Sequence, residues 1–186
     1  MTFDFSEFKN KKIIVTGSST GIGFETGIEF LNLGSNVIFH GNQSINDLEA
    51  RVKTKSQSQN FKIFKSDFTE LSQVDDFMNN AINYLDGLDI LVNNAGTMVG
   101  RYQLDSISEK DFLKIFDLNA KSAYFATKSA CTIFKKQNYG NIINVSTISA
   151  RTGGSAGSSV YAASKAFVSA ITRSLVSELS PYNIRI

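Results

Sequence analysis

The segment YAASK, Tyr161–Lys165, places a phenol and an ammonium four residues apart. Four residues make about one turn of an α-helix, so both side chains would lie on one helix face. A free phenol has a pKa near 10 and is a slow proton donor at neutral pH, but a neighbouring ammonium stabilises the phenolate. The pair could therefore serve as a general acid and base, whereas the same spacing on its own also describes an ordinary solvated helix surface.

Two further polar sites could complete such a device. Ser146 and Thr147 follow the apolar run NIINV, and either hydroxyl could hold a substrate oxygen. Asn119 lies in DLNAKSAYF on an otherwise apolar helix face, where a buried amide requires partners. The alternatives are a strand-ending hydroxyl bonded to backbone and an asparagine bonded to a neighbouring helix.

A glycine-rich turn, TGSSTGIG at 16–23, follows the first apolar run and precedes an amphipathic stretch. Gly17 suits a tight strand-to-helix turn, Gly21 lets backbone approach a pyrophosphate, and Gly23 lets the helix sit close on the sheet. Free amides at the helix start would face an anion, and Ser18, Ser19 and Thr20 add hydroxyl donors. The alternative is a glycine-rich turn that binds nothing.

Short apolar runs alternating with amphipathic stretches predict the elements that position these residues. We expect strands at 13–16, 36–39, 61–64, 89–92 and 141–145. Apolar spacings of three, four and seven predict a long helix over 108–136, with Ser108 and Asp111 as a capping pair. A second helix is expected over about 161–179. Strand–helix–strand units imply parallel pairing, so the predicted fold is an α/β doubly wound, Rossmann-like sheet forming one domain over 1–186.

Composition narrows the class of protein. The chain has 19 Lys and Arg against 17 Asp and Glu, without a basic block, which argues against a nucleic-acid partner. Cys131 and His40 are each the only residue of their type, which excludes an intramolecular disulfide and the usual Cys and His zinc site, so no metal is expected. No segment reads as a signal peptide or membrane span, and we expect a cytoplasmic protein without a membrane partner.

Taken together and in order, these motifs resemble those of the short-chain dehydrogenases/reductases. The matches are the TGxxxGIG turn, Asp67, NNAG at 93–96, Asn119, and Tyr161 with Lys165. Each motif is weak alone, whereas the full ordered set is specific. The resemblance covers residues 9–186. Within the family, the chain is similar in particular to the 3-oxoacyl-acyl-carrier-protein reductase-like members.

The resemblance implies an oxidoreductase that transfers a hydride between a nicotinamide cofactor and a carbonyl or secondary alcohol, with a 3-oxoacyl thioester as one candidate substrate. It makes Tyr161 the acid for reduction and base for oxidation, and Lys165 a ligand of the nicotinamide ribose. Thr147 stands at the hydroxyl position where the family usually has serine, with Ser146 as the alternative if the loop is shifted by one. Asn119 would bind a water that leads to the lysine.

The resemblance also implies a cofactor-binding set. Asp67 would bond the adenine amino group, or instead cap the following helix. An acid after the second strand would favour NAD, but Gly41 and neutral Asn42 stand there and a basic residue is absent too, so NADP is weakly preferred over NAD. The candidates are Gly17, Ser18, Ser19, Thr20, Gly21, Ile22, Gly23, Asn42, Asp67, Phe68, Asn94, Ala95, Gly96, Asn119, Tyr161 and Lys165.

Near the end of the chain, Pro181 stops the helix and NIRI at 183–186 reads as the start of a sixth strand. By resemblance the family continues with the rest of the sheet, a substrate lid and a last strand that commonly builds the oligomer interface. We therefore expect a chain incomplete at its C-terminus, which leaves a homo-oligomer open. A nucleotide-binding or interaction protein of the same fold that has lost catalysis, and a fragment that does not fold alone, are the competing readings.

Overall fold

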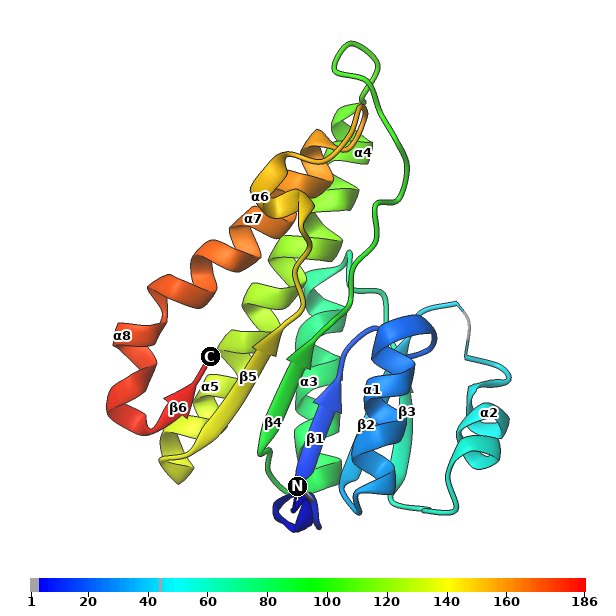
Figure 1. Ribbon diagram of the computed structural model, residues 1–186, viewed down its shortest axis with the longest axis vertical. Coiled ribbons are helices and arrows are strands. Elements are labelled where there is room, and N and C mark those ends of the chain that lie inside the picture. Colours follow the sequence, from blue (N-terminus) through cyan, green and yellow to red (C-terminus); the bar gives the residue numbers. More distant parts are fainter. Residues whose placement is uncertain (1–3, 44) are drawn as a thin grey trace.

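The computed structural model describes residues 4–43 and 45–186, and within them the strands form one parallel six-stranded sheet in the order β3-β2-β1-β4-β5-β6 (Figure 1). The predicted doubly wound α/β fold is confirmed, because sequence neighbours are joined by helical crossovers on both sides of β1. Each predicted strand is present to within two residues. Their bounds are β1 Lys12–Val15, β2 Asn36–Gly41, β3 Phe61–Lys65, β4 Ile90–Asn93, β5 Gly140–Asn144 and β6 Ile184–Arg185.

The helices connect these strands, and none of those described is long and apolar enough to cross a lipid bilayer. Short 3-10 turns at Ser6–Phe8 and Ser180–Tyr182 precede the first and last strands. The α-helices are α1 Gly21–Asn32, α2 Leu48–Lys55, α3 Leu71–Leu85, α4 Glu109–Phe116, α5 Ser122–Gln137, α6 Ser149–Thr152, α7 Ser159–Ser174 and α8 Val176–Leu179.

The long helix predicted over 108–136 is confirmed, with one irregular turn inside it. Ser108 Oγ accepts the Asp111 N–H at 3.1 Å, so the predicted capping pair forms. Between α4 and α5 the chain makes a π-helical turn, Asp117–Lys121, which contains Asn119. Such turns cost regular hydrogen bonding and often mark functional positions.

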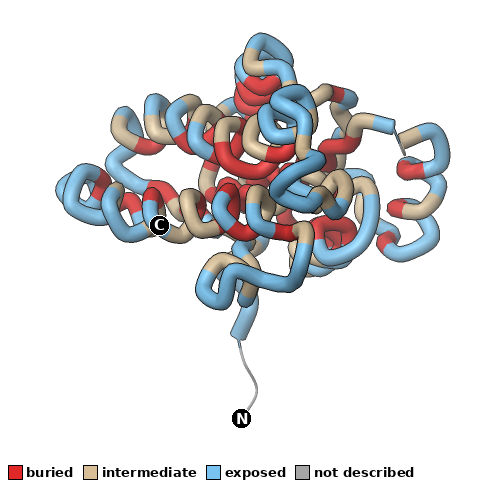
Figure 2. Tube along the Cα trace, turned by 90° about the horizontal axis from the view of Figure 1, so that it is seen from above, coloured by how far each residue is buried: buried red, intermediate tan, exposed pale blue. Residues whose placement is uncertain are grey.

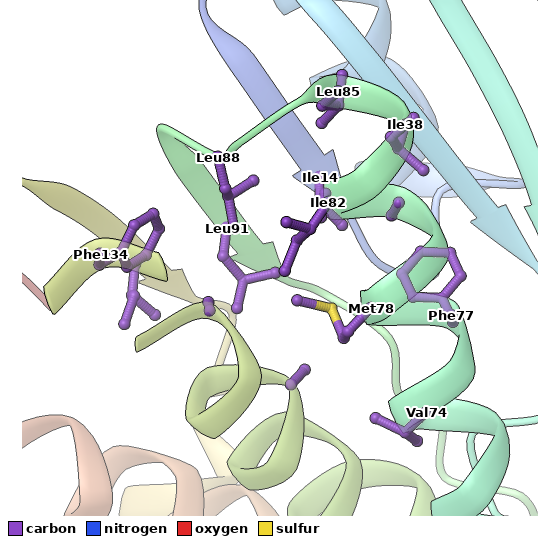
Figure 3. Packing of buried hydrophobic residues seen from close by; sticks show 14 of the residues in the cluster. Ile14, Ile38, Val74, Phe77, Met78, Ile82, Leu85, Leu88, Leu91 and Phe134 are labelled. Carbon is purple, nitrogen blue, oxygen red and sulfur yellow. The ribbon is translucent and has the colours of Figure 1, made fainter. Parts of the chain in front are cut away.

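Two apolar layers sandwich the sheet. One layer packs α1 and α2 on β1, β2 and β4, and the other packs α3 and α5 on the opposite face. Figure 3 shows the second layer, with Ile14, Ile38 and Leu91 of the sheet facing Phe77 and Met78 of α3. Burial is concentrated along this central slab, while the outer turns of the helices are exposed (Figure 2).

Coverage of the sheet is uneven at β5. Ile142 points into the layer of α3 and α5 and is 3% exposed. Ile143 points the other way and is 42% exposed, because on its side α1 lies over β1 and β2 and α2 lies toward the β3 edge, so neither of these helices reaches β5 (Figure 1). One half of the described sheet is thus covered on both faces and the other half on one.

Candidate active site

The candidate residues gather at one edge of the sheet. In a parallel sheet every strand ends at the same edge, and ligands of open α/β sheets bind there. The glycine turn follows β1, Asn42 follows β2, Asp67 follows β3 and NNAG begins within β4. Thr147 follows β5, and α7 then supplies Tyr161 and Lys165. The topology therefore brings the sequence-predicted residues to a single carboxyl edge.

The glycine turn has the backbone that its sequence predicts. Gly17 has φ +61°, and a Cβ there would lie 2.6 Å from Ala95 Cα. Gly21 has φ +59° but faces open space, with no atom within 4 Å of a would-be Cβ. Both positions require glycine for their left-handed backbone, and Gly17 requires it for packing as well. The solvent-accessible space beside Gly21 lies at the start of α1, where the first backbone N–H groups have no partner within the helix.

Gly23 has a different role from the one expected. A Cβ on Gly23 would lie 2.6 Å from Gly17 O and would also contact the Asn94 amide, so Gly23 packs against the turn itself. The close approach of α1 to the sheet occurs at Gly27 instead, where a Cβ would contact the Phe39 ring. The sequence prediction for Gly23 is therefore wrong in its partner, although glycine is still required there.

The NNAG segment fixes the turn from behind. Asn94 Nδ2 donates to Thr16 O at 3.0 Å and to Gly17 O at 2.8 Å. Thr16 Oγ1 in turn accepts the N–H groups of Asn94 and Ala95, each at 3.0 Å. The Asn94 side chain is thus engaged in holding the turn, and the Thr16 hydroxyl is a contributor that the sequence does not reveal, because Thr16 there is only the last residue of the predicted strand 13–16.

Ser18 was expected to offer a hydroxyl donor to a ligand, and the structure corrects this. Ser18 is fully buried, its Oγ donates to Val15 O at 2.6 Å and it accepts the His40 N–H at 2.8 Å. Its hydroxyl is therefore spent on joining β1 to β2. Thr20 and Ile22 are exposed and Ser19 is half-buried, so these neighbours still border the open side of the turn.

A cleft of about 320 Å³ opens beside the turn, between the ends of β2 and β3. Asp67 Oδ1 accepts both the N–H and the hydroxyl of Thr69, at 2.9 and 2.8 Å, while Glu70 rather than Asp67 occupies the N-cap of α3. Burial raises the pKa of Asp67, but the bonds from Thr69 and Asn42 and the charge on Lys114 outweigh it and leave the pKa below its usual value. The cleft is lined by Ser19, His40, Asn42, Gln43, Ser66, Asp67, Phe68, Thr69, Thr97, Lys114 and Leu118.

The end of β2 has no room for an acidic side chain. A Cβ on Gly41 would lie 2.7 Å from Ser19 Cβ and 2.7 Å from Ile45 Cγ2. Gly41 is buried, and Asn42 is the first residue after it that lines the cleft. The position at which an acid would read a ribose 2′-hydroxyl is therefore closed by packing as well as occupied by glycine.

Lys165 and Asn119 converge beside Gly96. The Lys165 side chain is buried, at 5% exposure, and its Nζ donates to Val145 O at 3.0 Å. Burial lowers the pKa of Lys165. Asn119 Nδ2 donates to Thr97 O and Ile115 O, both at 2.8 Å, whereas its Oδ1 is buried without a hydrogen-bond partner among the described residues. A Cβ on Gly96 would contact this Oδ1 and lie 2.9 Å from Lys165 Nζ.

The two hydroxyls after β5 differ in what they bond. Ser146 Oγ lies 2.8 Å from Ser169 Oγ and donates to Lys165 O at 3.3 Å, so it faces α7. Thr147 Oγ1 accepts the Ser149 N–H at 3.3 Å and keeps its own hydrogen for another acceptor. Tyr161 is half-buried at the start of α7. The contacts therefore favour Thr147 over Ser146 as the hydroxyl available to a ligand.

Besides the Thr16 hydroxyl, two further contributors to the site carry no motif in the sequence. His40 is buried and bonds the glycine turn, and the Val145 carbonyl anchors the lysine. A lone histidine in a strand carries no motif, and a backbone carbonyl carries no residue-type signal at all. The one sequence feature that points to His40 is its adjacency to Gly41, the position at which an acid would favour NAD.

The donor set and the shape of the edge fit a dinucleotide. The open glycine and the start of α1 suit a pyrophosphate, the cleft beside Asp67 suits an adenosine, and the unpartnered Asn119 Oδ1 beside a buried ammonium marks a polar site that awaits a partner. These three regions follow one another along the edge in the order of a dinucleotide.

Comparison with known proteins gives consistent matches. The family model described as short chain dehydrogenase matches residues 11–186. The chain is 34% identical to the 3-oxoacyl-acyl-carrier-protein reductase of Chlamydia pneumoniae over 95% of its own length and 70% of that protein. It is 29% identical to the hydroxynaphthalene reductase-like protein Arp2 of Metarhizium guizhouense, of which it spans 61% while 88% of this chain is covered. A crystal structure of NADH-dependent reductase A1-R' complexed with NAD matches with a TM-score of 0.91 and 32% identity, covering 98% of this chain and 78% of that one.

Proposed function

The chain belongs to the short chain dehydrogenase family, and we propose that it is an NAD(P)-dependent oxidoreductase that interconverts a carbonyl and a secondary alcohol. The observation that carries the proposal is the convergence of a buried ammonium and an unpartnered buried amide oxygen beside Gly96. Burial of a charge and of an unpaired acceptor destabilises a fold, and both are retained where a ligand uses them.

The proposed catalytic roles follow from the chemistry of four side chains, those of Asn119, Thr147, Tyr161 and Lys165. The nicotinamide, when bound, supplies or accepts the hydride. Reduction leaves negative charge on the substrate oxygen, to which Tyr161 gives its phenolic proton and Thr147 donates a hydrogen bond. Lys165, held by the Val145 carbonyl, stabilises the phenolate that remains and has further N–H groups for a ribose hydroxyl.

Asn119 completes a path by which the proton is replaced. Its Oδ1 and Lys165 Nζ both lie against Gly96, and Oδ1 has no hydrogen-bond partner among the described residues. A water that bridges these two groups would accept from the ammonium and donate to Oδ1, linking the lysine toward solvent. The π-helical turn at Asp117–Lys121 is what places this amide inward instead of along the regular helix face.

We propose NADP(H) as the preferred cofactor, by a modest margin over NAD(H). Gly41 leaves no acid to repel a 2′-phosphate, and packing against Ser19 and Ile45 keeps the position closed. Asn42 can donate to either a hydroxyl or a phosphate oxygen. Comparison of the dissociation constants of NADPH and NADH by fluorescence titration tests this preference. Tighter NADPH binding is expected, and tighter NADH binding would overturn the preference while leaving the proposed reaction intact.

The residues described at the catalytic end favour no particular carbonyl compound. Arg101, the cation on the loop after β4, donates to Ser155 Oγ at 2.7 Å and Ala156 O at 3.1 Å, so its guanidinium joins two loops. A 3-oxoacyl thioester is the first candidate substrate, from the resemblance to the reductase of Chlamydia pneumoniae. Ethyl acetoacetate is a small probe of the same 3-oxo ester class.

The reaction is tested by the loss of NADPH absorbance when the purified chain is mixed with ethyl acetoacetate. Wild-type protein is expected to consume NADPH, and Tyr161→Phe is expected to bind NADPH unchanged but turn over at least about 100-fold more slowly, the scale of one general acid. Tyr182→Phe, at an exposed phenol in the turn Ser180–Tyr182 after α8, is the matched control. Nucleotide binding without turnover over a broad carbonyl panel would instead favour a binding protein that has lost catalysis.

A further inference from the structure

His40, the single histidine of the chain, lines the candidate adenosine cleft. It lies between the glycine turn, which forms one wall of the cleft, and the segment Ser66–Phe68 after β3, which forms the other and is called the Asp67 wall. It belongs to β2 and is 3% exposed. On one side its backbone and ring contact the glycine turn, and on the other its ring contacts the segment after β3. No motif identified in the sequence includes this residue.

Three hydrogen bonds join His40 to the glycine turn. Its Nδ1 accepts the Gly17 N–H at 2.8 Å, its carbonyl accepts the Ser18 N–H at 2.8 Å, and its own N–H donates to Ser18 Oγ at 2.8 Å. Only the first of these uses the side chain. The ring nitrogen is thus the single side-chain acceptor for the amide of the glycine whose left-handed backbone starts the turn.

The opposite ring nitrogen reaches the other wall. Because Nδ1 accepts, the neutral ring carries its hydrogen on Nε2, which donates to Ser66 O at 3.1 Å. Phe68 stacks on the ring at a centroid distance of 3.9 Å, and Phe77 packs edge-on at 4.8 Å. One rigid, uncharged ring therefore spans the space from Gly17 to the residue before Asp67.

We propose that His40 is a positioning residue for the dinucleotide, which holds the glycine turn at the correct spacing from the Asp67 wall by accepting the Gly17 N–H. The proposal rests on the proposed function, since it concerns the same cofactor. Its specific content is that the acceptor at Nδ1 sets cofactor affinity, while the Nε2 bond to Ser66 and the bulk of the ring contribute to stability.

Two amide variants, each of which can reproduce the position of one ring nitrogen, separate the roles of Nδ1 and Nε2. In His40→Asn the amide oxygen can occupy the place of Nδ1 and accept from Gly17, but nothing reaches Ser66. In His40→Gln the amide nitrogen can occupy the place of Nε2 and donate to Ser66, but the Gly17 acceptor is lost. Leu88→Ala, a buried position at the opposite, amino-terminal edge of the sheet, is the control for loss of stability alone.

The experiment measures NADPH and NADH dissociation constants and, on the nucleotide-free proteins, amide hydrogen exchange of the peptide covering the turn. His40→Asn is expected to stay within about threefold of wild-type affinity and protection. His40→Gln is expected to bind at least tenfold more weakly and to exchange faster at the turn, and Leu88→Ala to lose stability without either change.

Different failures have different meanings. Suppose that the wild type binds nucleotide and that His40→Asn and His40→Gln lose affinity equally. Suppose alternatively that all three variants, Leu88→Ala included, lose affinity in proportion to their loss of melting temperature. Either result would overturn the positioning role of His40 and leave the proposed function standing. If the wild type binds neither nucleotide, the proposed function falls, and the cofactor role of His40 with it. Unchanged turn protection in His40→Gln would overturn the Gly17 contact even where binding is weakened.

Discussion

The two ends of the candidate site treat their polar groups in opposite ways. Around the glycine turn, polar side chains form hydrogen bonds with backbone groups and thereby stabilise the conformation of the turn. These side chains belong to Thr16, Ser18, His40 and Asn94. At the catalytic end, Asn119 keeps a buried oxygen without a partner among the described residues, and Lys165 is a buried cation with one carbonyl as its described acceptor.

This difference matches two different tasks, binding the cofactor at the glycine turn and transferring protons at the catalytic end. A turn that presents backbone amides to a pyrophosphate works best when its scaffold is rigid and internally satisfied. A group that moves protons must keep hydrogen-bonding capacity for its ligand, and it is therefore left unsatisfied in the free protein at some expense of stability. The comparison predicts that glycine substitutions in the turn lose stability together with binding, and that substitutions at the second end lose activity without losing stability.

The largest effect is expected at Lys165. Lys165→Met removes the ammonium that assists the phenol, so we expect turnover to fall at least about 100-fold, which is typical for loss of an acid–base group. Because burial disfavours the charged form of Lys165, the free energy of unfolding is expected to stay equal or to rise by about 1 kcal/mol. Steady-state NADPH oxidation and urea unfolding check the two halves. Lys136→Met, at an exposed position of α5, is the control. A variant that is both inactive and markedly less stable would break the contrast.

Two glycines of the turn separate packing from conformation. Gly17→Ala is expected to lower the free energy of unfolding by about 3 kcal/mol, because a left-handed alanine costs about 1–2 kcal/mol and its Cβ collides with Ala95. Gly21→Ala has the same backbone in open space and should cost about 1 kcal/mol. Denaturant unfolding measures both, and nucleotide titration is expected to show weakened binding in each. Equal stabilities would contradict the packing role of Gly17.

His40 makes the stability of the first end depend on pH. Burial lowers its pKa from 6.5 to about 4, against smaller opposing effects from the Ser66 carbonyl and Asp67, the charged group that acts on it. The unfolded chain therefore binds the proton more tightly, so the contribution is complete above pH 6.5 and is lost as pH falls toward 4. Between pH 7 and pH 5 the loss is about 2 kcal/mol. Chemical unfolding of wild type and His40→Asn checks it, since the variant should lack this part of the pH dependence.

The smallest effect tests the uneven coverage of β5. Ile142→Val removes a buried methylene and should cost about 1 kcal/mol, whereas Ile143→Val on the open face should cost a few tenths. The two substitutions are chemically identical and adjacent, so thermal unfolding of the pair isolates burial. Equal losses would mean that the open face is covered in solution.

Much of this arrangement was predictable from residue types and order. The strands, the capping pair at Ser108 and the positive φ of Gly17 follow from local patterns, and the convergence of the motifs follows from parallel topology. The inward hydroxyl of Ser18, the true partner of Gly23 and the bond from His40 to Gly17 depend on which atoms of distant segments meet. Sequence spacing cannot specify such contacts, because the side chains involved have equally good local alternatives.

In the proposed reaction, Tyr161 and Lys165 complete a hydride transfer from a nicotinamide cofactor to a carbonyl carbon. It is tested most directly with NADPH deuterated at both C4 positions and ethyl acetoacetate, followed by mass spectrometry of the alcohol. Wild-type protein is predicted to place one deuterium on the carbinol carbon, and Tyr161→Phe to form at least about 100-fold less labelled alcohol while still binding the cofactor. Labelled alcohol formed equally by the phenylalanine variant, or none formed by a wild type that binds the cofactor, would contradict the claim.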